Sequence, residues 1–206
     1  FATGASPASI TTADVNGDFL YMPDSHAFDD GFAEVSAYFH ASQAAAYFRT
    51  QHAFTWGCGG STQMQIITNY TESPHVAYEN AMFVPGGRSR CGYLAFGQGV
   101  NSDFSYDGDV VTHELGHAVT DSISDLGYFA SGPAPSYQPL AINEGTSDYW
   151  AATLQGDPQV AESLPSLEGF GGGGALRTLD NDLSCPQDLF GEGHYDGRIW
   201  SALGWT

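Results

Sequence analysis

The stretch His113-Glu114-Leu115-Gly116-His117 places two imidazoles four residues apart in the chain. On an α-helix, residues with this spacing lie one turn apart on the same face, so both rings can reach one metal ion. Glu114 lies beside the histidines as a separate carboxylate. This HExxH pattern predicts a catalytic zinc site in which the two histidines are ligands.

The residues around the motif favour a helix. Val111, Ala118 and Val119 recur with the spacing that is typical of one apolar helix face. We expect Asp109 to cap the start of this helix and Gly127 to end it.

A catalytic zinc ion normally takes three protein ligands, and the best candidate for the third is Glu144. Asp148 lies one helical turn further on, so one carboxylate can bind metal while the other accepts the N–H of a ligand histidine. The alternative is that Glu144 only complements a helix dipole and Asp148 is a surface residue. The upstream HExxH motif favours the metal-binding interpretation.

Two segments, HELGHAVTD at 113–121 and AINEGTSDYW at 141–150, resemble the gluzincin metallopeptidases, the group that contains thermolysin. Glu144 follows His117 by 27 residues, a spacing longer than in thermolysin and nearer the fungalysin type. The segment from His194 to Trp200 is also similar to the fungalysin pattern. The resemblance runs from about residue 29 to residue 200 and is dense around residues 80–83, 109–128 and 141–150.

The resemblance implies an α+β fold, a thermolysin-like zincin catalytic unit. Its N-terminal twisted β-sheet with a long helix would be followed by helices that carry HExxH and the glutamate ligand. We expect residues 1–108 to form the β-rich part and residues 109–206 the helical active-site part of the same catalytic unit. The relatives continue into a C-terminal helical lobe that is mostly absent from these 206 residues. Either the chain is a fragmentary catalytic part, or the second lobe is missing.

The resemblance also implies a zinc-dependent endopeptidase with one Zn²⁺ per chain and polypeptide substrates. Glu114 would be the general base that takes a proton from the attacking water. Tyr128 and His194 would donate hydrogen bonds to the oxyanion that forms on the scissile carbonyl. The structural alternatives are a core aromatic for Tyr128 and a helix cap for His194.

Substrate contacts are expected from two segments. Asn80-Ala81-Met82-Phe83 resembles the family's edge strand, where the Asn80 side chain and the Ala81 backbone hold an extended peptide, although ordinary sheet structure explains it nearly as well. Arg177 resembles the family arginine that hydrogen-bonds a substrate carbonyl. The carboxylate that orients His194 stays open among three candidates, Asp180, Asp182 and Asp188.

Composition limits the class of partner. The chain has 24 acidic and 5 basic residues and a formal charge of −19, which excludes nucleic acid and anionic membrane surfaces as partners. No apolar run approaches the roughly 20 residues that span a bilayer. The sequence begins at Phe1 without methionine, so we expect a processed, secreted protein whose own propeptide is a partner before maturation. A C-terminal continuation that completes the cleft is a further expected partner.

The sequence also bears on calcium binding and on the pairing of the three cysteines. The family's calcium carboxylates are not reproduced after Glu144, since Asp157 and Glu162 do not match their positions, and Ca²⁺ binding stays open. A Cys58–Cys91 disulfide is the preferred pairing and would contribute about 3 kcal/mol. The third cysteine, at position 185, would be free or paired outside this chain.

Helical spacing of Phe32, Val35, Phe39, Ala46 and Tyr47 predicts a core helix from Asp29 to about Ala53, capped by Asp29 or Asp30.

Strand-forming runs at 64–70, 80–83 and 92–96 predict an antiparallel or mixed sheet. Asn16-Gly17 predicts a hairpin near the N-terminus, in preference to a calcium loop over residues 14–18.

Two other functions compete with the peptidase. One is a catalytically inactive zincin remnant that acts as a binding or adhesion module, although such a remnant has no reason to keep Glu114 beside the metal. The other is an intracellular aminopeptidase, whose upstream GxMEN signature is not present, because Met82 follows Asn80-Ala81.

Overall fold

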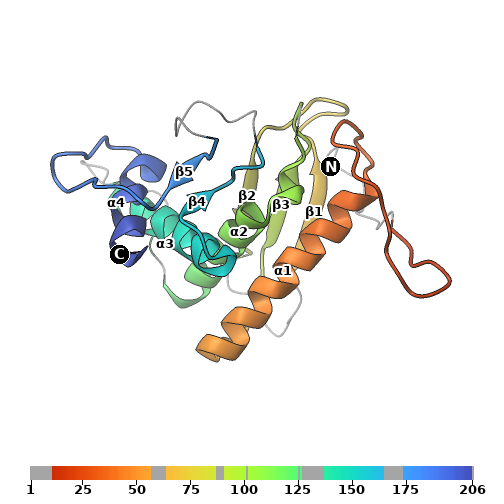
Figure 1. The fold of residues 1–206 in the computed structure, drawn as a ribbon, viewed down its shortest axis with the longest axis horizontal. Helices are drawn as coiled ribbons and strands as arrows, with labels where there is room; N and C mark the ends of the chain where they lie inside the picture. The colour runs from red at the N-terminus through yellow and green to blue at the C-terminus, as the bar shows by residue number, and fades with distance from the viewer. Residues whose placement is uncertain are drawn as a thin grey trace.

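A computed structural model describes residues 11–56, 64–86, 91–100, 102–124, 126, 137–164 and 174–205 of the chain. Within these residues a long helix and a small mixed sheet precede three helices and a short two-stranded ribbon (Figure 1). The elements in chain order are α1 (Gly31–His52), β1 (Gln65–Tyr70), β2 (Ala81–Val84), β3 (Tyr93–Gly97), η2 (Phe104–Tyr106), α2 (Gly108–Ile123), α3 (Gln138–Gln155), β4 (Gln159–Val160), β5 (Arg177–Thr178) and α4 (Gly193–Trp205). The predicted α+β fold is confirmed.

The sheet is mixed, as predicted, with β3 in its centre. β1 pairs with β3 in parallel and β2 pairs with β3 in antiparallel orientation, so β2 is an edge of the described sheet. Leu94 and Phe96 of β3 are fully buried and join the hydrophobic core with Phe48 of α1 and Val111 of α2. Helix α2 therefore rests on the sheet, and its motif lies close to the β2 edge.

The predicted helix over residues 29–53 is confirmed, and Tyr47 packs against the core as expected, but Phe39 was wrongly assigned to the buried face. Asp30 caps the start by accepting a hydrogen bond from the Phe32 N–H, and Ala53 ends the helix in the left-handed region. Phe39 is 55% exposed, whereas the buried face consists mainly of small residues. Alanines let α1 approach α2 and the sheet closely, which large side chains would prevent. The buried alanines are Ala33, Ala37, Ala41 and Ala44.

Helix α2 is capped by Asp107, so the predicted cap at Asp109 was wrong. The Asp107 carboxylate accepts hydrogen bonds from the N–H groups of Asp109 and Val110. The Asp109 side chain is buried instead and accepts the Ala161 N–H at 3.1 Å. The helix ends at Ile123, before Gly127, which lies outside the described residues.

Helices α3 and α4 cross at very short distance. A Cβ atom on Gly145 would lie 2.3 Å from the carbonyl oxygen of Gly197, so both positions require the absence of a side chain. The Trp200 indole N–H donates to the Thr146 hydroxyl at 3.0 Å beside this crossing. The crossing brings the start of α4, with His194, over the α3 turn that carries Glu144.

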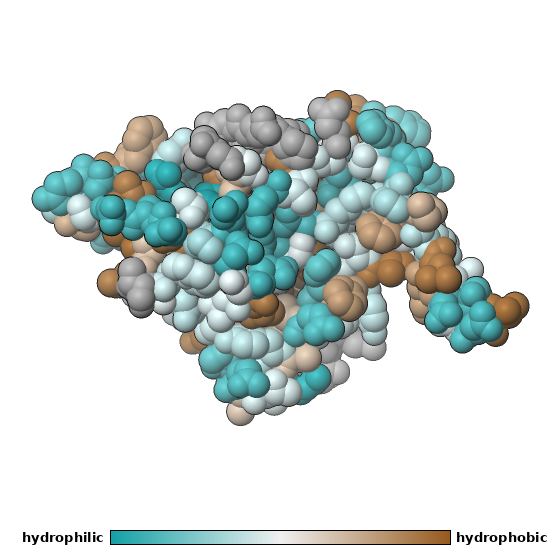
Figure 2. Space-filling view, in the orientation of Figure 1, coloured by the Kyte–Doolittle hydropathy of each residue, from teal (hydrophilic) through white to brown (hydrophobic). Residues whose placement is uncertain are grey.

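The hairpin predicted at Asn16-Gly17 was wrong, because the described residues around this turn form no strand. A turn forms, since the Asp14 N–H donates to the Asp18 carbonyl at 2.8 Å, but no strand flanks it. Val15 and Leu20 are exposed. Figure 1 shows this segment projecting from the rest of the fold, and Figure 2 shows hydrophobic residues on it. The turn alone cannot hold two strands together, because no core lies beneath them.

Cys185 is free and exposed. Cys58 lies outside the described residues, so the Cys58–Cys91 bridge stays a prediction. The division into parts at residues 108 and 109 also stays a prediction. No helix in the described ranges is long and apolar enough to cross a membrane.

Candidate metal centre and active site

The paired imidazoles of α2 and a carboxylate of α3 converge on one point. Glu144 Oε2 lies 3.2 Å from His113 Nε2 and 3.6 Å from His117 Nε2. All three side chains are buried, and each offers one ligand atom within 4.8 Å of the other two. Two imidazole nitrogens and one carboxylate oxygen are a donor set typical of catalytic zinc.

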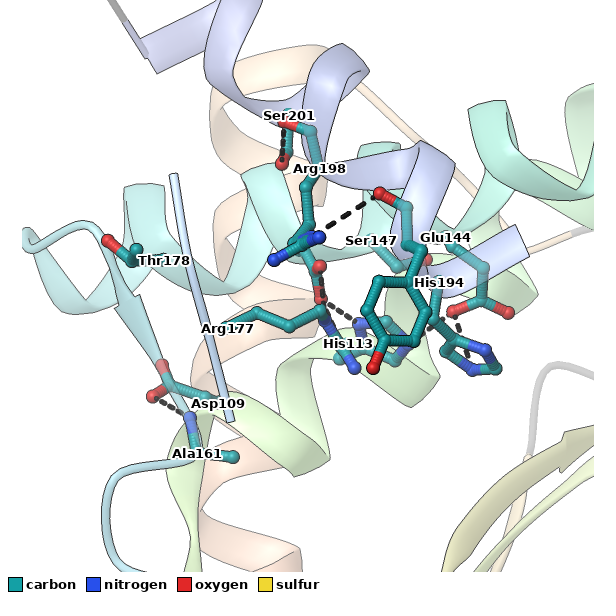
Figure 3. A network of polar contacts seen from close by, with 12 residues as sticks. Asp109, His113, Glu144, Ser147, Ala161, Arg177, Thr178, His194, Arg198 and Ser201 are labelled. Carbon is teal, nitrogen blue, oxygen red and sulfur yellow. Dashed lines mark hydrogen bonds and ion pairs between the residues drawn. The ribbon is translucent and has the colours of Figure 1, made fainter. Parts of the chain in front are cut away.

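The convergence fits a cation because one buried oxygen is otherwise unsatisfied. Glu144 Oε2 accepts no hydrogen bond from the described residues, although buried carboxylate oxygens are rarely left in that state. Figure 3 shows the Glu144 side chain reaching toward His113 and His194. A divalent ion among these atoms would neutralise the carboxylate and use the lone pairs of both rings.

The outer nitrogen of each imidazole has a polar partner. His113 Nδ1 lies 2.8 Å from Asp148 Oδ1, and Arg177 holds the same carboxylate through two donors, at 2.6 and 2.7 Å. His117 Nδ1 lies 3.0 Å from both Asn143 Oδ1 and Ser147 Oγ. These contacts favour protons on Nδ1 and leave each Nε2 lone pair directed at the convergence point.

The charges of the site reinforce one another. Burial alone would raise the pKa of Asp148, but the Arg177 guanidinium and His113 hold it well below its ordinary value. Burial alone would lower the pKa of His113, yet Asp148 and Glu144 raise it to about 10 without a metal. A proton and a metal ion therefore compete for His113, and acid favours the proton.

Glu114 is placed beside the convergence point without being part of it. Its side chain is buried and lines the same groove, and its carboxylate accepts a hydrogen bond from the Phe83 N–H. Burial raises the pKa of Glu114 above its ordinary value, while the neighbouring histidines oppose that shift. A carboxylate with a raised pKa is better matched to accepting a proton near neutral pH.

His194 approaches the site from the start of α4. Its Nε2 lies 3.4 Å from Glu144 Oε2, and its Nδ1 lies 2.8 Å from Glu192 Oε1. The side chain is 51% exposed, so it lies where the site opens. The expectation that Asp180, Asp182 or Asp188 orients this ring was wrong, because Glu192, two residues earlier on the same turn, contacts it.

A groove of about 230 Å³ runs between the β2 edge and the convergence point. Asn80 and Ala81 line one side, and Arg177 lines it beside the histidines. Arg177 was expected to contact substrate, but its guanidinium is committed in large part to Asp148. Tyr128 lies outside the described residues.

Three residues that contact the histidines of the site were not predicted from the sequence. Asn143 and Ser147 were not singled out, although they neighbour Glu144 and Asp148 on α3 and a helical projection places them near the same face. Glu192 gave no signal, because a carboxylate two residues from a histidine is common in turns.

The first part of the chain, which includes β2 and most of α2, matches a known family of proteins. Residues 5–121 match the family model of the thermolysin metallopeptidase catalytic domain.

The chain belongs to the thermolysin family of metallopeptidases. The match includes HExxH and ends before Glu144. Among solved structures, this thermolysin-family chain is similar to the precursor of protealysin, a metalloproteinase from Serratia proteamaculans, with 22% identity and a TM-score of 0.45. The similarity covers 71% of this chain and 41% of the protealysin precursor, so the chain spans less than half of that protein. No curated protein matches the chain.

A second acidic group lies at the start of α2 in this thermolysin-family chain. Asp107, Asp109 and Glu162 each place a carboxylate oxygen within 4.8 Å of the others. Asp109 Oδ1 is buried and accepts no hydrogen bond from the described residues. Burial and the nearby charge of Asp107 raise the pKa of Asp109 to about 8.

Proposed function

We propose that this protein is a zinc-dependent endopeptidase, with His113, His117 and Glu144 as zinc ligands. The observation that carries the proposal is the meeting of two Nε2 atoms with a buried carboxylate oxygen that lacks a hydrogen-bond donor. When bound, zinc supplies a Lewis acid and an acidified water, whose pKa falls toward about 7. One Zn²⁺ per chain fits the single group of this kind in the described residues.

Glu114 acts as the general base. It lies in the groove next to the ligands, and its raised pKa suits it to accept a proton from the attacking water. The same carboxylic acid then protonates the leaving amine, because the departing nitrogen needs the proton that the water has lost. Both transfers occur within one buried pocket and require no further acid.

His194 and Tyr128 stabilise the negative oxygen that develops on the scissile carbonyl. Glu192 holds His194 through Nδ1, which leaves Nε2 directed toward Glu144 and the groove. Burial alone would raise the pKa of Glu192, but its hydrogen bonds to His194 and to the Tyr195 N–H lower it. In its doubly protonated form the ring donates Nδ1–H to the ionised Glu192 and keeps Nε2–H as a donor to the oxyanion.

The substrate binds as an extended peptide along β2. This strand has a free edge among the described residues, and its residues Ala81–Val84 run beside the groove. Backbone pairing with an edge strand holds any main chain irrespective of sequence. Asn80 adds a side-chain amide to this edge, and Arg177 faces the opposite part of the groove.

We further propose that Ca²⁺ binds at the group formed by Asp107, Asp109 and Glu162. Oxygen donors suit calcium, and the unsatisfied Asp109 Oδ1 lies between two other carboxylates. The ion would link the start of α2 to the segment after β4, where the Ala161 N–H already binds Asp109.

The protein is proposed to act outside the cell, after release from its own propeptide. Its formal charge of −19 suits an extracellular enzyme with no nucleic acid or membrane partner. A C-terminal continuation is proposed to complete the cleft beyond His194, which is half exposed.

The test is hydrolysis of casein and of quenched peptides by wild-type protein and Glu114→Gln, with zinc content measured in parallel. Glu114→Gln is expected to keep about one zinc per chain and to lose activity by at least about 10²-fold. Glu72→Gln, an exposed glutamate elsewhere, is the matched control and is expected to behave as wild type. Zinc binding by the wild type without turnover would favour the inactive remnant instead.

A further inference from the structure

A second cavity adjoins the proposed active-site groove. Its volume is about 430 Å³, and it shares Asn80, Leu176, Arg177 and His194 with the groove. A peptide held along β2 therefore has this cavity beside it, within one or two residues of the bond next to His194. The remaining lining comes from Glu79, Glu192, Tyr195 and Arg198.

Arg198 gives this cavity a positive charge without an acidic partner. Its guanidinium lies 4.8 Å from the centre of the Tyr195 ring, and its Nε–H donates to the Tyr195 carbonyl at 3.3 Å. Among the described residues it forms no ion pair, whereas Arg177 is paired with Asp148. Figure 3 shows the Arg198 side chain extending from α4 toward Arg177. Its outer nitrogens remain as donors for a bound group.

The two acidic residues of the cavity are engaged elsewhere. Glu192 binds His194 through Oε1 and accepts the Tyr195 N–H through Oε2. Glu79 accepts the N–H of Val100. Neither carboxylate forms an ion pair with Arg198 among the described residues, because each is oriented by these other contacts.

Two of the five basic residues in a chain with 24 acidic residues line this one cavity. We propose that the cavity is a specificity pocket in which Arg198 binds a carboxylate of the substrate next to the scissile bond. A planar guanidinium, fixed on an aromatic ring, matches the two oxygens of a carboxylate. The inference rests on the proposed peptidase function and adds its substrate class: peptides with an acidic group near the cleavage site.

The carboxylate can belong to an Asp or Glu side chain or to the peptide C-terminus. One set of quenched peptides has amidated C-termini and carries Glu, Gln or Lys at each position within two residues of the scissile bond. A second set carries Gln and ends, within two residues of that bond, in a free carboxylate or an amide. At low salt, kcat/KM is expected to favour the carboxylate form about tenfold in at least one set.

Arg198→Met keeps an apolar stem but removes the charge, and is expected to bring that ratio close to one. Arg198→Lys is expected to restore part of the preference, and Arg198→Glu to reverse it in favour of the Lys peptide. Arg49→Met, an exposed arginine on α1, is the matched control and is expected to leave the ratio unchanged. Melting curves show whether each variant is folded.

Binding separates this inference from the proposed function. Labelled, amidated Glu and Gln peptides are titrated into Glu114→Gln protein with and without Arg198→Met, and fluorescence anisotropy gives each Kd. The Glu peptide is expected to bind about tenfold more tightly, and only when Arg198 is present. If the wild type hydrolyses no peptide but the Glu peptide still binds about tenfold more tightly, the proposed peptidase function is overturned and the binding pocket is supported. Equal affinities, or a preference that persists in folded Arg198→Met, would overturn the pocket.

Discussion

The Asp148 carboxylate contacts both a proposed zinc ligand and an arginine at the candidate metal centre. One carboxylate binds His113 and accepts two hydrogen bonds from Arg177, while only 1% of its surface is exposed. It is held ionised by these partners, so it orients the imidazole and makes the ring a stronger donor to a metal.

Asp148→Asn is therefore expected to weaken zinc binding by about 10- to 100-fold. The neutral amide has one acceptor oxygen and cannot accept hydrogen bonds from His113 and Arg177 as the carboxylate does. Zinc competition with a chromophoric chelator measures the change. The matched control is Asp182→Asn at an exposed aspartate, for which zinc affinity is expected to stay at the wild-type value. Wild-type affinity in Asp148→Asn would show that the contact has no role in metal binding.

Residues related by helical spacing could be placed from the sequence, while partners from other elements could not. His113 and His117 follow from one helix turn, and Glu144 and Asp148 from another. Glu192 became visible only in the fold, because its position beside His194 depends on how the turn before α4 is closed. Asp107 was missed as the cap for a similar reason: tertiary burial takes Asp109 away from the helix end.

At the scale of elements, the crossing of α3 and α4 positions His194 over Glu144. The two helices approach through Gly145 and Gly197, and a hydrogen bond between Trp200 and Thr146 lies alongside. The segment from His194 to Trp200 could be matched to a family pattern from the sequence, but the packing that explains its glycine depends on the neighbouring helix.

Gly145→Ala is expected to lower the free energy of unfolding by about 1–3 kcal/mol, because the new Cβ meets a backbone carbonyl that can move only with its helix. Activity is expected to fall further than stability alone accounts for, since His194 moves with α4. Chemical denaturation and kcat/KM measure the two effects. Gly204→Ala, on the exposed side of α4, meets only the Tyr149 ring and is expected to cost less. Equal effects at both positions would contradict the role of the crossing.

Element boundaries were easier to predict than the faces they bury. Helix α1 was located well, yet Phe39 faces solvent, and apart from Phe48 the buried face is made mainly of alanines. Hydrophobicity gives alanine little weight, although only small residues permit this close approach to α2 and the sheet.

For the whole molecule, the acidic group at the start of α2 is expected to link the free energy of unfolding to pH and, through the proposed calcium site, to Ca²⁺. The pKa of Asp109 is about 8 in the folded protein and 3.8 in its ordinary state. Between these values the folded protein holds a proton that the unfolded chain releases, so stability falls as pH rises through this window.

In calcium-free buffer, wild-type stability is expected to fall between about pH 4 and pH 8 with a contribution of up to about 1.4 kcal/mol per pH unit from this group. Asp109→Asn is expected to lose that contribution, because the amide does not titrate. Urea denaturation across the pH range measures the difference between the two proteins. Parallel curves for both would contradict the raised pKa.

Calcium is expected to oppose this loss, since the ion replaces the proton among the three carboxylates. Millimolar Ca²⁺ at pH 8 should raise the melting temperature of the wild type by several degrees, but not that of Asp109→Asn. Asp182→Asn should respond as wild type. An equal rise in all three proteins would indicate calcium binding at another place.

The zinc centre itself is tested most directly by X-ray absorption at the zinc K-edge on the purified, zinc-loaded protein, compared with Glu144→Gln. The wild-type spectrum is predicted to contain two imidazole ligands and additional oxygen ligands, and the variant to lose bound zinc while keeping its fold. A spectrum with sulfur ligands, or with more than two imidazoles, would contradict the assignment of His113, His117 and Glu144, as would full zinc retention in Glu144→Gln.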